Sequence, residues 1–197
     1  MRPIDYRVKG LESMLKEISR ISEEIVENVV SLKATPDSIR KRINDVREMR
    51  LEIHRNIVEI MARYQPTASD LRGLIAALEI SYGLYRFSRY ALDISTVLDR
   101  VTRISGASCD LRYSSMISKR VVEMVRGSIE AFLNRDKSRA RAIIEMDREV
   151  DQTLFTALDE ASRSANICST LDLLILMYLE RIADHSVYIA QEIIEML

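Results

Sequence analysis

Leu84-Tyr-Arg-Phe-Ser-Arg-Tyr-Ala-Leu-Asp-Ile94 has a counterpart 95 residues later in the chain, Leu179-Glu-Arg-Ile-Ala-Asp-His-Ser-Val-Tyr-Ile189. Apolar residues recur through both stretches at the i, i+3, i+4 and i+7 spacing of an amphipathic helix. We expect the same offset of 95 residues to align the helix that precedes the first stretch with the helix that precedes the second, without a gap. Such self-similarity indicates a duplicated helical unit.

Helix-breaking residues divide the chain into six predicted helices. Thr35 can cap a helix whose first position is Pro36, and further breaks fall at 65–70, 105–113, 134–136 and 162–166. Connections this short force successive helices to run antiparallel. We therefore expect an elongated all-α protein of two tandem antiparallel three-helix bundles, over residues 1–106 and 107–197. The predicted helices cover 4–33, 36–64, 68–104, 113–133, 136–162 and 167–196.

The composition fits a globular helical protein. Of the 197 residues, 47% are hydrophobic and 30% charged, with five glycines, three prolines and no tryptophan. So few turn residues argue against a sandwich, barrel or Rossmann fold. The net charge of -1 creates no general attraction to nucleic acid or to an anionic bilayer. The most apolar stretch, 171–179, is shorter than the roughly 20 residues of a membrane span, so we expect a cytoplasmic protein.

Several common kinds of site are not indicated. Cys109 and Cys168 lie far apart without a Cys-x-x-Cys pattern, which predicts two reduced thiols rather than a disulfide or a zinc knuckle. Single glycines exclude a Gly-rich phosphate loop. Neither His54 nor His185 has a glutamate three residues before it, as the Glu-x-x-His motif of di-iron bundles requires. We expect His185 at a more exposed helical phase, outside any direct ligand set.

Two pairs of acidic residues interrupt apolar helix faces in the second half of the chain. Asp147 and Asp151, and likewise Glu180 and Asp184, are spaced i, i+4 and so lie one turn apart on one face. Carboxylates in a low-dielectric groove resist joint ionisation. A basic side chain, proton uptake or a hard metal ion could compensate for their charge. In the alternative interpretation, each acid borders the core and pairs with an exposed arginine.

The stretch Tyr178-Leu-Glu-Arg-Ile-Ala-Asp-His-Ser-Val-Tyr-Ile-Ala-Gln-Glu192 resembles the PhoU family, whose hallmark is Leu-Glu-Arg-Ile-(Ala/Gly)-Asp-His-x-x-x-Ile-Ala. Asp147-Arg-Glu-Val-Asp151 is similar to the companion motif on the preceding helix. The resemblance implies two three-helix, spectrin-like bundles side by side with carboxylate-lined metal sites. It implies that the ligands here are Asp147, Asp151, Glu180 and Asp184, and that iron or zinc is favoured over magnesium or manganese.

The function implied by this resemblance is a non-enzymatic one, without catalytic residues. The protein would be a homodimer that negatively regulates a phosphate ABC transporter and its signalling kinase. Its partners would be the transporter ATPase, the sensor histidine kinase or both. Three alternatives stay open: an accessory subunit of another ion-transport system, a carboxylate-metal phosphoester hydrolase, and a structural adaptor without metal. A bound metal could also capture phosphate at the same site.

The first half departs from the acidic pattern. The offset of 95 places Glu52, Asn56, Tyr85 and Arg89 at the four acidic positions. A guanidinium brings a permanent positive charge and makes a poor trap for a cation. The sequence therefore predicts that the first half has lost its metal site. An ion pair between Arg89 and Glu52 is expected in the place of the metal.

Overall fold

Six helices account for nearly all of the computed structural model, which describes residues 2–163 and 166–197. The six lie within a few residues of their predicted bounds, and the described residues contain no strand. Ser164 and Ala165, inside the predicted break at 162–166, are outside the described residues. The helices are α1 (Pro3–Val30), α2 (Pro36–Tyr64), α3 (Ala68–Ser105), α4 (Arg112–Asn134), α5 (Lys137–Arg163) and α6 (Ile167–Met196).

Capping residues fix where the helices begin. The Thr35 hydroxyl accepts a hydrogen bond from the Ser38 amide at the start of α2, with Pro36 in the first turn, as predicted. Thr67 and Asp70 form a reciprocal capping box at the start of α3. The helix α3 ends at Gly106, whose φ of 62° is the left-handed conformation that glycine adopts readily. These local signals explain why the sequence predicted the helix bounds well.

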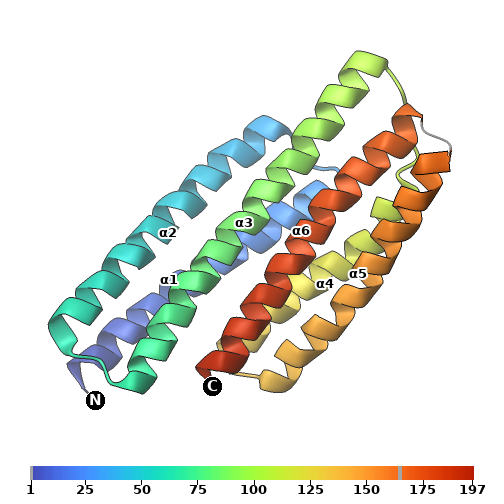
Figure 1. Cartoon of the computed structure of the whole chain (residues 1–197). Helices are drawn as coiled ribbons and strands as arrows, with labels where there is room; N and C mark the ends of the chain where they lie inside the picture. The colour runs from blue at the N-terminus through green and yellow to red at the C-terminus, as the bar shows by residue number, and fades with distance from the viewer. Residues whose placement is uncertain (1, 164–165) are drawn as a thin grey trace.

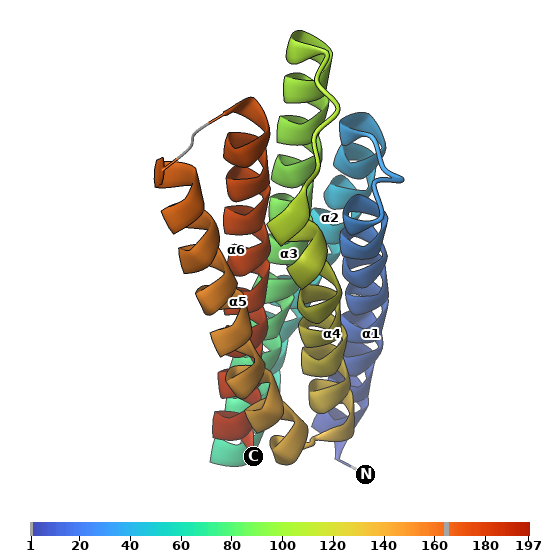
Figure 2. The same ribbon diagram turned by 90° about the vertical axis from the view of Figure 1, so that its right-hand side faces the viewer.

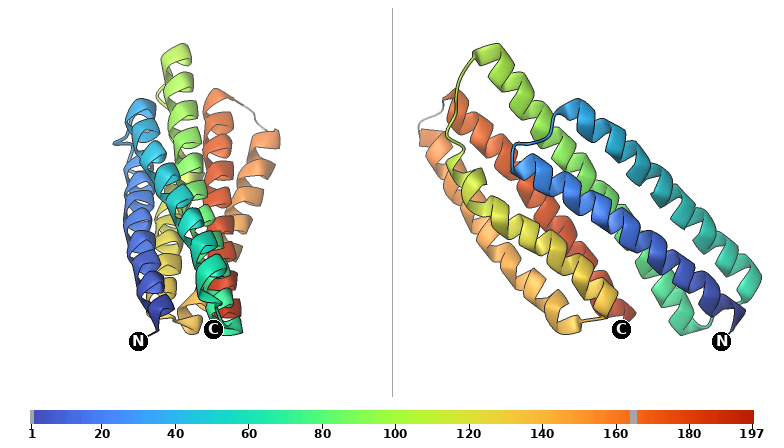
Figure 3. Two further views of the ribbon diagram at one scale, coloured as in Figure 1. Left: turned by 90° about the vertical axis from the view of Figure 1, so that its left-hand side faces the viewer. Right: turned by 180° about the vertical axis from the view of Figure 1, so that it is seen from behind.

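The helices form two antiparallel three-helix bundles lying side by side, as expected, with both chain termini at one end (Figures 1 and 2). The first bundle contains α1, α2 and α3, and the second contains α4, α5 and α6. They meet where α3 packs on α6 and where α1 packs on α4. The helices α1 and α4 lie together on the rear face of the molecule, which the right-hand view of Figure 3 shows. On the opposite side, α2 and α5 flank the central pair α3 and α6 (Figure 1).

The linker between the bundles is fastened to the start of α6. The buried Asp172 accepts hydrogen bonds from the amides of Tyr113 (2.8 Å) and Ser114 (2.9 Å). It thereby caps α4, whose own N-cap residue, Leu111, offers no side-chain acceptor. The capping carboxylate thus comes from another helix, 59 residues further along the chain from Tyr113.

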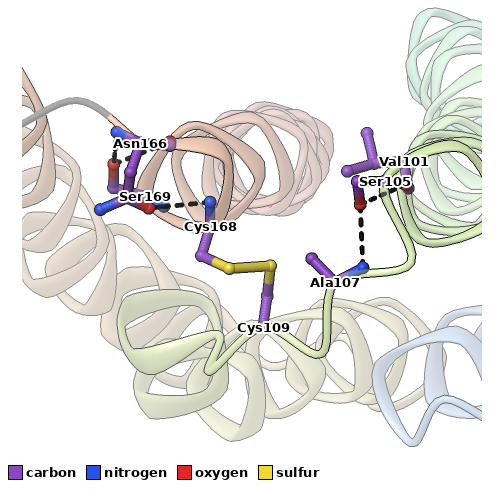
Figure 4. Close-up of a disulfide and its surroundings, with 7 residues drawn as sticks. All are labelled: Val101, Ser105, Ala107, Cys109, Asn166, Cys168 and Ser169. Atoms are coloured by element: carbon purple, nitrogen blue, oxygen red, sulfur yellow. Dashed lines mark hydrogen bonds between the residues drawn. A yellow bond between two sulfur atoms is a disulfide. The ribbon is translucent and has the colours of Figure 1, made fainter.

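The prediction of two reduced thiols is wrong, because Cys109 and Cys168 form a disulfide (Figure 4). Cys109 belongs to the linker after α3, and Cys168 to the first turn of α6. The two residues are 59 positions apart with their Cα atoms at 5.1 Å. Sequence spacing gave no signal of this pairing, because only the antiparallel return of α6 brings its first turn next to the linker.

Reduction of the disulfide is expected to destabilise the protein by about 2–4 kcal/mol, because the crosslink restricts the unfolded chain. Thermal melting followed by circular dichroism, with and without dithiothreitol, measures this loss. The Cys109→Ser/Cys168→Ser protein is the control and should melt alike under both conditions. An untreated protein with two titratable thiols, or a melting temperature unaffected by reductant, would contradict the prediction.

Candidate metal centre

The four predicted acidic ligands come from two neighbouring helices, with Asp147 and Asp151 on α5 and Glu180 and Asp184 on α6. All four are partly buried. The residues Ile143, Val150 and Ala157 bury one stripe of α5, and this stripe fixes the side on which the acids of that helix lie. The sequence predicted acids that face inward, and the structure buries them only in part. The ion pairs of the exposed Arg181 with Glu180 and Asp184 match the alternative interpretation for α6.

The carboxylates lie close enough to perturb one another. Burial, and then the charges of Asp151 and Asp184, raise the pKa of Asp147 to about 6. Burial and the charge of Asp184 raise the pKa of Glu180 to about 7, and the other two acids add to this effect. One oxygen of Asp147, Oδ1, is buried without a hydrogen-bond partner. The cluster therefore has an unsatisfied preference for a proton or a cation.

Arg181 supplies part of the missing positive charge. Its guanidinium lies 3.5 Å from a carboxylate oxygen of Glu180 and 3.1 Å from one of Asp184. Since Arg181 is itself exposed, these ion pairs neutralise the acids only from the solvent side. The described residues include no set of three or more histidine, cysteine or acidic side chains close enough to hold a metal ion. The oxygen donors suit a hard cation, but binding one requires the side chains to draw together.

His185 lies beside the acids but belongs to a different environment. Its ring packs edge-on against Tyr90 of α3, with the centroids 5.5 Å apart, and its Nδ1 is 3.0 Å from the backbone oxygen of Arg181. Burial and the neighbouring Arg86 lower its pKa. The sequence expected a more exposed position, whereas the structure places the ring in the seam between the two bundles.

The acids have different counterparts in the first half from those expected. The offset of 95 holds for α3 and α6, but it pairs the buried Val46 and Ile53 of α2 with the exposed Arg141 and Arg148 of α5. An offset of 97 residues aligns the buried positions of α2 and α5. This offset is two residues larger than the offset that aligns α3 with α6. The matched pairs are Ile43 with Ala140, Val46 with Ile143, Ile53 with Val150 and Ile60 with Ala157.

This shift changes the first-half counterparts of Asp147 and Asp151 from Glu52 and Asn56 to Arg50 and His54. Glu52 and Asn56 instead line a surface cavity between α1 and α2. The Asn56 amide reaches the sulfur of Met14 on α1, at 3.8 Å.

The expected ion pair between Arg89 and Glu52 is absent, since no nitrogen of Arg89 lies within 4.0 Å of a Glu52 oxygen. The reason is geometric: Glu52 faces α1, whereas Arg89 belongs to α3.

Comparison with known proteins assigns both halves to one family. The family model described as "PhoU domain" matches residues 12–98 and 115–193. The phosphate-specific transport system accessory protein PhoU homolog of Zymomonas mobilis is 28% identical over 206 residues, which cover 97% of this chain and 85% of that protein. The homolog of Caulobacter vibrioides is 32% identical over 147 residues, covering 71% of this chain and 64% of its own length.

Solved structures show the same fold. The crystal structure of PhoU from Pseudomonas aeruginosa matches with a TM-score of 0.88 at 24% identity, over 98% of this chain and 97% of that one. The phosphate transport system regulatory protein PhoU from Streptococcus pneumoniae matches with a TM-score of 0.79 at 18% identity, over 98% and 96%. Within residues 2–163 and 166–197, none of the helices has the length and apolarity needed to cross a bilayer.

The raised pKa values predict a pH-dependent stability in chelator-treated protein. The folded state holds protons on Asp147 and Glu180 more tightly than the unfolded chain, so this stabilisation is full below about pH 4 and is lost as the pH rises to about 7. Glu180→Gln should therefore raise the stability at pH 8 by about 1 kcal/mol, or roughly 2–4 °C in melting temperature, and flatten the profile.

The control for this measurement is Glu145→Gln, which changes an exposed acid of α5 that pairs with Arg148. It should leave the pH profile of thermal melting unchanged. Equal stability of wild type at pH 8 and pH 5, together with no effect of Glu180→Gln at either pH, would contradict the prediction. The raised pKa values of these carboxylates would then not affect the stability of the protein.

Proposed function

Because the chain belongs to the PhoU family, we propose that it is a non-enzymatic metal-binding regulator of phosphate uptake. It acts as a cytoplasmic homodimer that restrains a phosphate ABC transporter and the sensor kinase coupled to it. The observation that supports this role is the match of both halves to the PhoU domain, together with relatives named as accessory proteins of phosphate transport. Membrane contact occurs only through these partners.

The metal is proposed to bind in the second bundle. Asp147, Asp151, Glu180 and Asp184 would hold it, and a divalent or trivalent ion would supply the positive charge that this cluster lacks. The unpartnered oxygen of Asp147 and the raised pKa of Glu180 support the proposal, because both indicate carboxylates with too little compensation. Iron or zinc is favoured, although a site of oxygen donors also suits magnesium or manganese.

The chemistry supplied by the metal is electrostatic. By neutralising the acids it would fix α5 against α6, two helices that otherwise bring like charges together. This gives the metal a structural route to regulation, because the relative position of α5 and α6 can alter how the bundle docks on a partner.

Elemental analysis of protein purified without chelator tests the metal site. We expect bound iron or zinc in wild type, and at least a tenfold loss of affinity in Asp151→Asn and in Glu180→Gln, since each removes a charged ligand. Glu145→Gln is the matched control and should keep the wild-type metal content. Metal-free wild type that takes up no ion after soaking, or equal metal in all variants, would refute the site.

Phosphate uptake by cells tests the regulatory role. In a bacterial host without its own PhoU protein, expression of this chain should reduce uptake of radiolabelled phosphate in phosphate-rich medium. Asp151→Asn should restrain uptake less than wild type at equal protein level, because the helix pair that the metal stabilises is loosened. Unchanged uptake, with no copurification of the chain with the transporter ATPase or the kinase, would contradict the proposal.

A further inference from the structure

Two partly buried arginines in the first bundle lack an ion pair among the described residues. Arg50 of α2 and Arg86 of α3 are partly buried and form no ion pair, and the Nε atom of each is buried without a hydrogen-bond partner. Within the described part of the chain, the other partly buried arginines, Arg42 and Arg120, both pair with glutamates. A buried guanidinium without a carboxylate partner is unfavourable unless another anion reaches it.

Tyrosine rings hold both guanidiniums in place. The Cζ of Arg50 lies 5.3 Å from the ring centroid of Tyr82 and 5.8 Å from that of Tyr85. The Cζ of Arg86 lies 4.5 Å from the centroid of Tyr90, whose hydroxyl accepts a hydrogen bond from Nη2. An arginine held against an aromatic face keeps N–H donors at the edge of its guanidinium plane available for an anion. The tyrosines therefore preorganise the arginines without satisfying all of their donors.

Part of this cluster occupies the positions that match the acids of the second bundle, whereas Arg86 matches Arg181. With the offset of 97 for α2 and α5, and 95 for α3 and α6, Arg50 replaces Asp147 and His54 replaces Asp151. On the third helix of each bundle, Tyr85 replaces Glu180 and Arg89 replaces Asp184. No acid remains at the four positions, and two of them are occupied by arginine.

Tyr82, Arg86 and Arg89 also share one face of α3, being spaced i, i+4 and i+7. The acid near these residues is Asp93, which is partly buried. Its carboxylate forms no ion pair with Arg86 or Arg89 within 4.0 Å, although both arginines favour its charged form. Glu52 faces away toward α1. Asp93 therefore acts on Arg86 and on the exposed Arg89 of α3, whereas Arg50 of α2 forms no ion pair.

We propose that Arg50, Arg86 and Arg89, with the phenol of Tyr82, form a binding site for a phosphate-type oxyanion on the α2–α3 face. A tetrahedral oxyanion matches several guanidiniums from two helices, because it offers acceptor oxygens in several directions and can carry two negative charges. A metal in the second bundle is not needed for this binding. The proposed site thus includes Arg50 and Arg89, which stand at positions that carry acids in the second bundle.

Isothermal titration calorimetry with inorganic phosphate, at low ionic strength and in the presence of EDTA, tests the site on the full-length protein. We expect wild type to bind phosphate, and Arg50→Gln and Arg86→Gln each to weaken binding by about tenfold or more. Arg50→Lys should weaken binding less than Arg50→Gln. Lysine keeps the positive charge and loses only the bidentate hydrogen bonding of arginine, whereas glutamine loses both. Circular dichroism melting checks that each variant is folded.

The matched control is Arg55→Gln, which removes an exposed arginine of α2 that forms no ion pair in the described structure. Phosphate affinity should remain at the wild-type value in this variant. A loss of affinity equal to that of Arg50→Gln would show only a general effect of net charge and would overturn the proposal.

Two further titrations identify the source of the anion and separate this site from the metal centre. O-phosphoserine replaces inorganic phosphate in the first, and binding of the monoester alone would support the site and assign it to a phosphorylated molecule. Failure of wild type to bind either compound overturns the proposal. In the second, phosphate is titrated into Asp147→Asn with EDTA present. Unchanged affinity supports the arginine site, whereas loss of binding there would place the anion at the acids.

Discussion

The antiparallel packing of α3 on α6 is the contact on which the rest of the structure depends. It joins the two bundles, and it is tight enough at Gly83 that an added Cβ would lie 2.9 Å from the side chain of Ile189. Because the two helices run in opposite directions, corresponding residues of the repeats are brought toward each other at the seam. Tyr90 of α3 contacts His185 of α6, and these two residues occupy corresponding positions in the repeat.

The seam also places two opposite charge environments on neighbouring helices. Burial and neighbouring carboxylates raise the pKa of Asp147 on α5 and of Glu180 on α6, whereas Arg50 and Arg86 form no ion pair. The same three-helix scaffold occurs twice, and the positions that carry acids in the second copy carry arginine, histidine and tyrosine in the first. Burial lowers the pKa of His185 in this seam, and the charges of Arg86 on α3 and Arg181 on α6 add to the effect.

Local signals explain which parts of the molecule could be predicted from the sequence. Capping residues such as Thr35 and Thr67, and the 3.6-residue periodicity, depend only on near neighbours in the chain, and the six helices followed from them. The partial burial of Asp147 and Glu180 followed from the same periodicity. The disulfide between Cys109 and Cys168 and the cap that Asp172 supplies to α4 could not be predicted, because each joins segments about 60 residues apart.

The sequence alone determined an all-α chain, its duplication and the four carboxylates of the second half, since helix periodicity and residue identity are written along the chain. Only the tertiary structure decided the alignment of α2 with α5. The pattern of buried residues reveals the two-residue shift between these helices, whereas their sequence similarity is too weak to do so. In this alignment Glu52 lies on the side of α2 that faces α1, and Arg50 lies against the ring of Tyr85. Residue identity alone placed Arg89 among the four positions, whereas packing decided that Arg50 rather than Glu52 matches Asp147, because only burial reveals the register of α2.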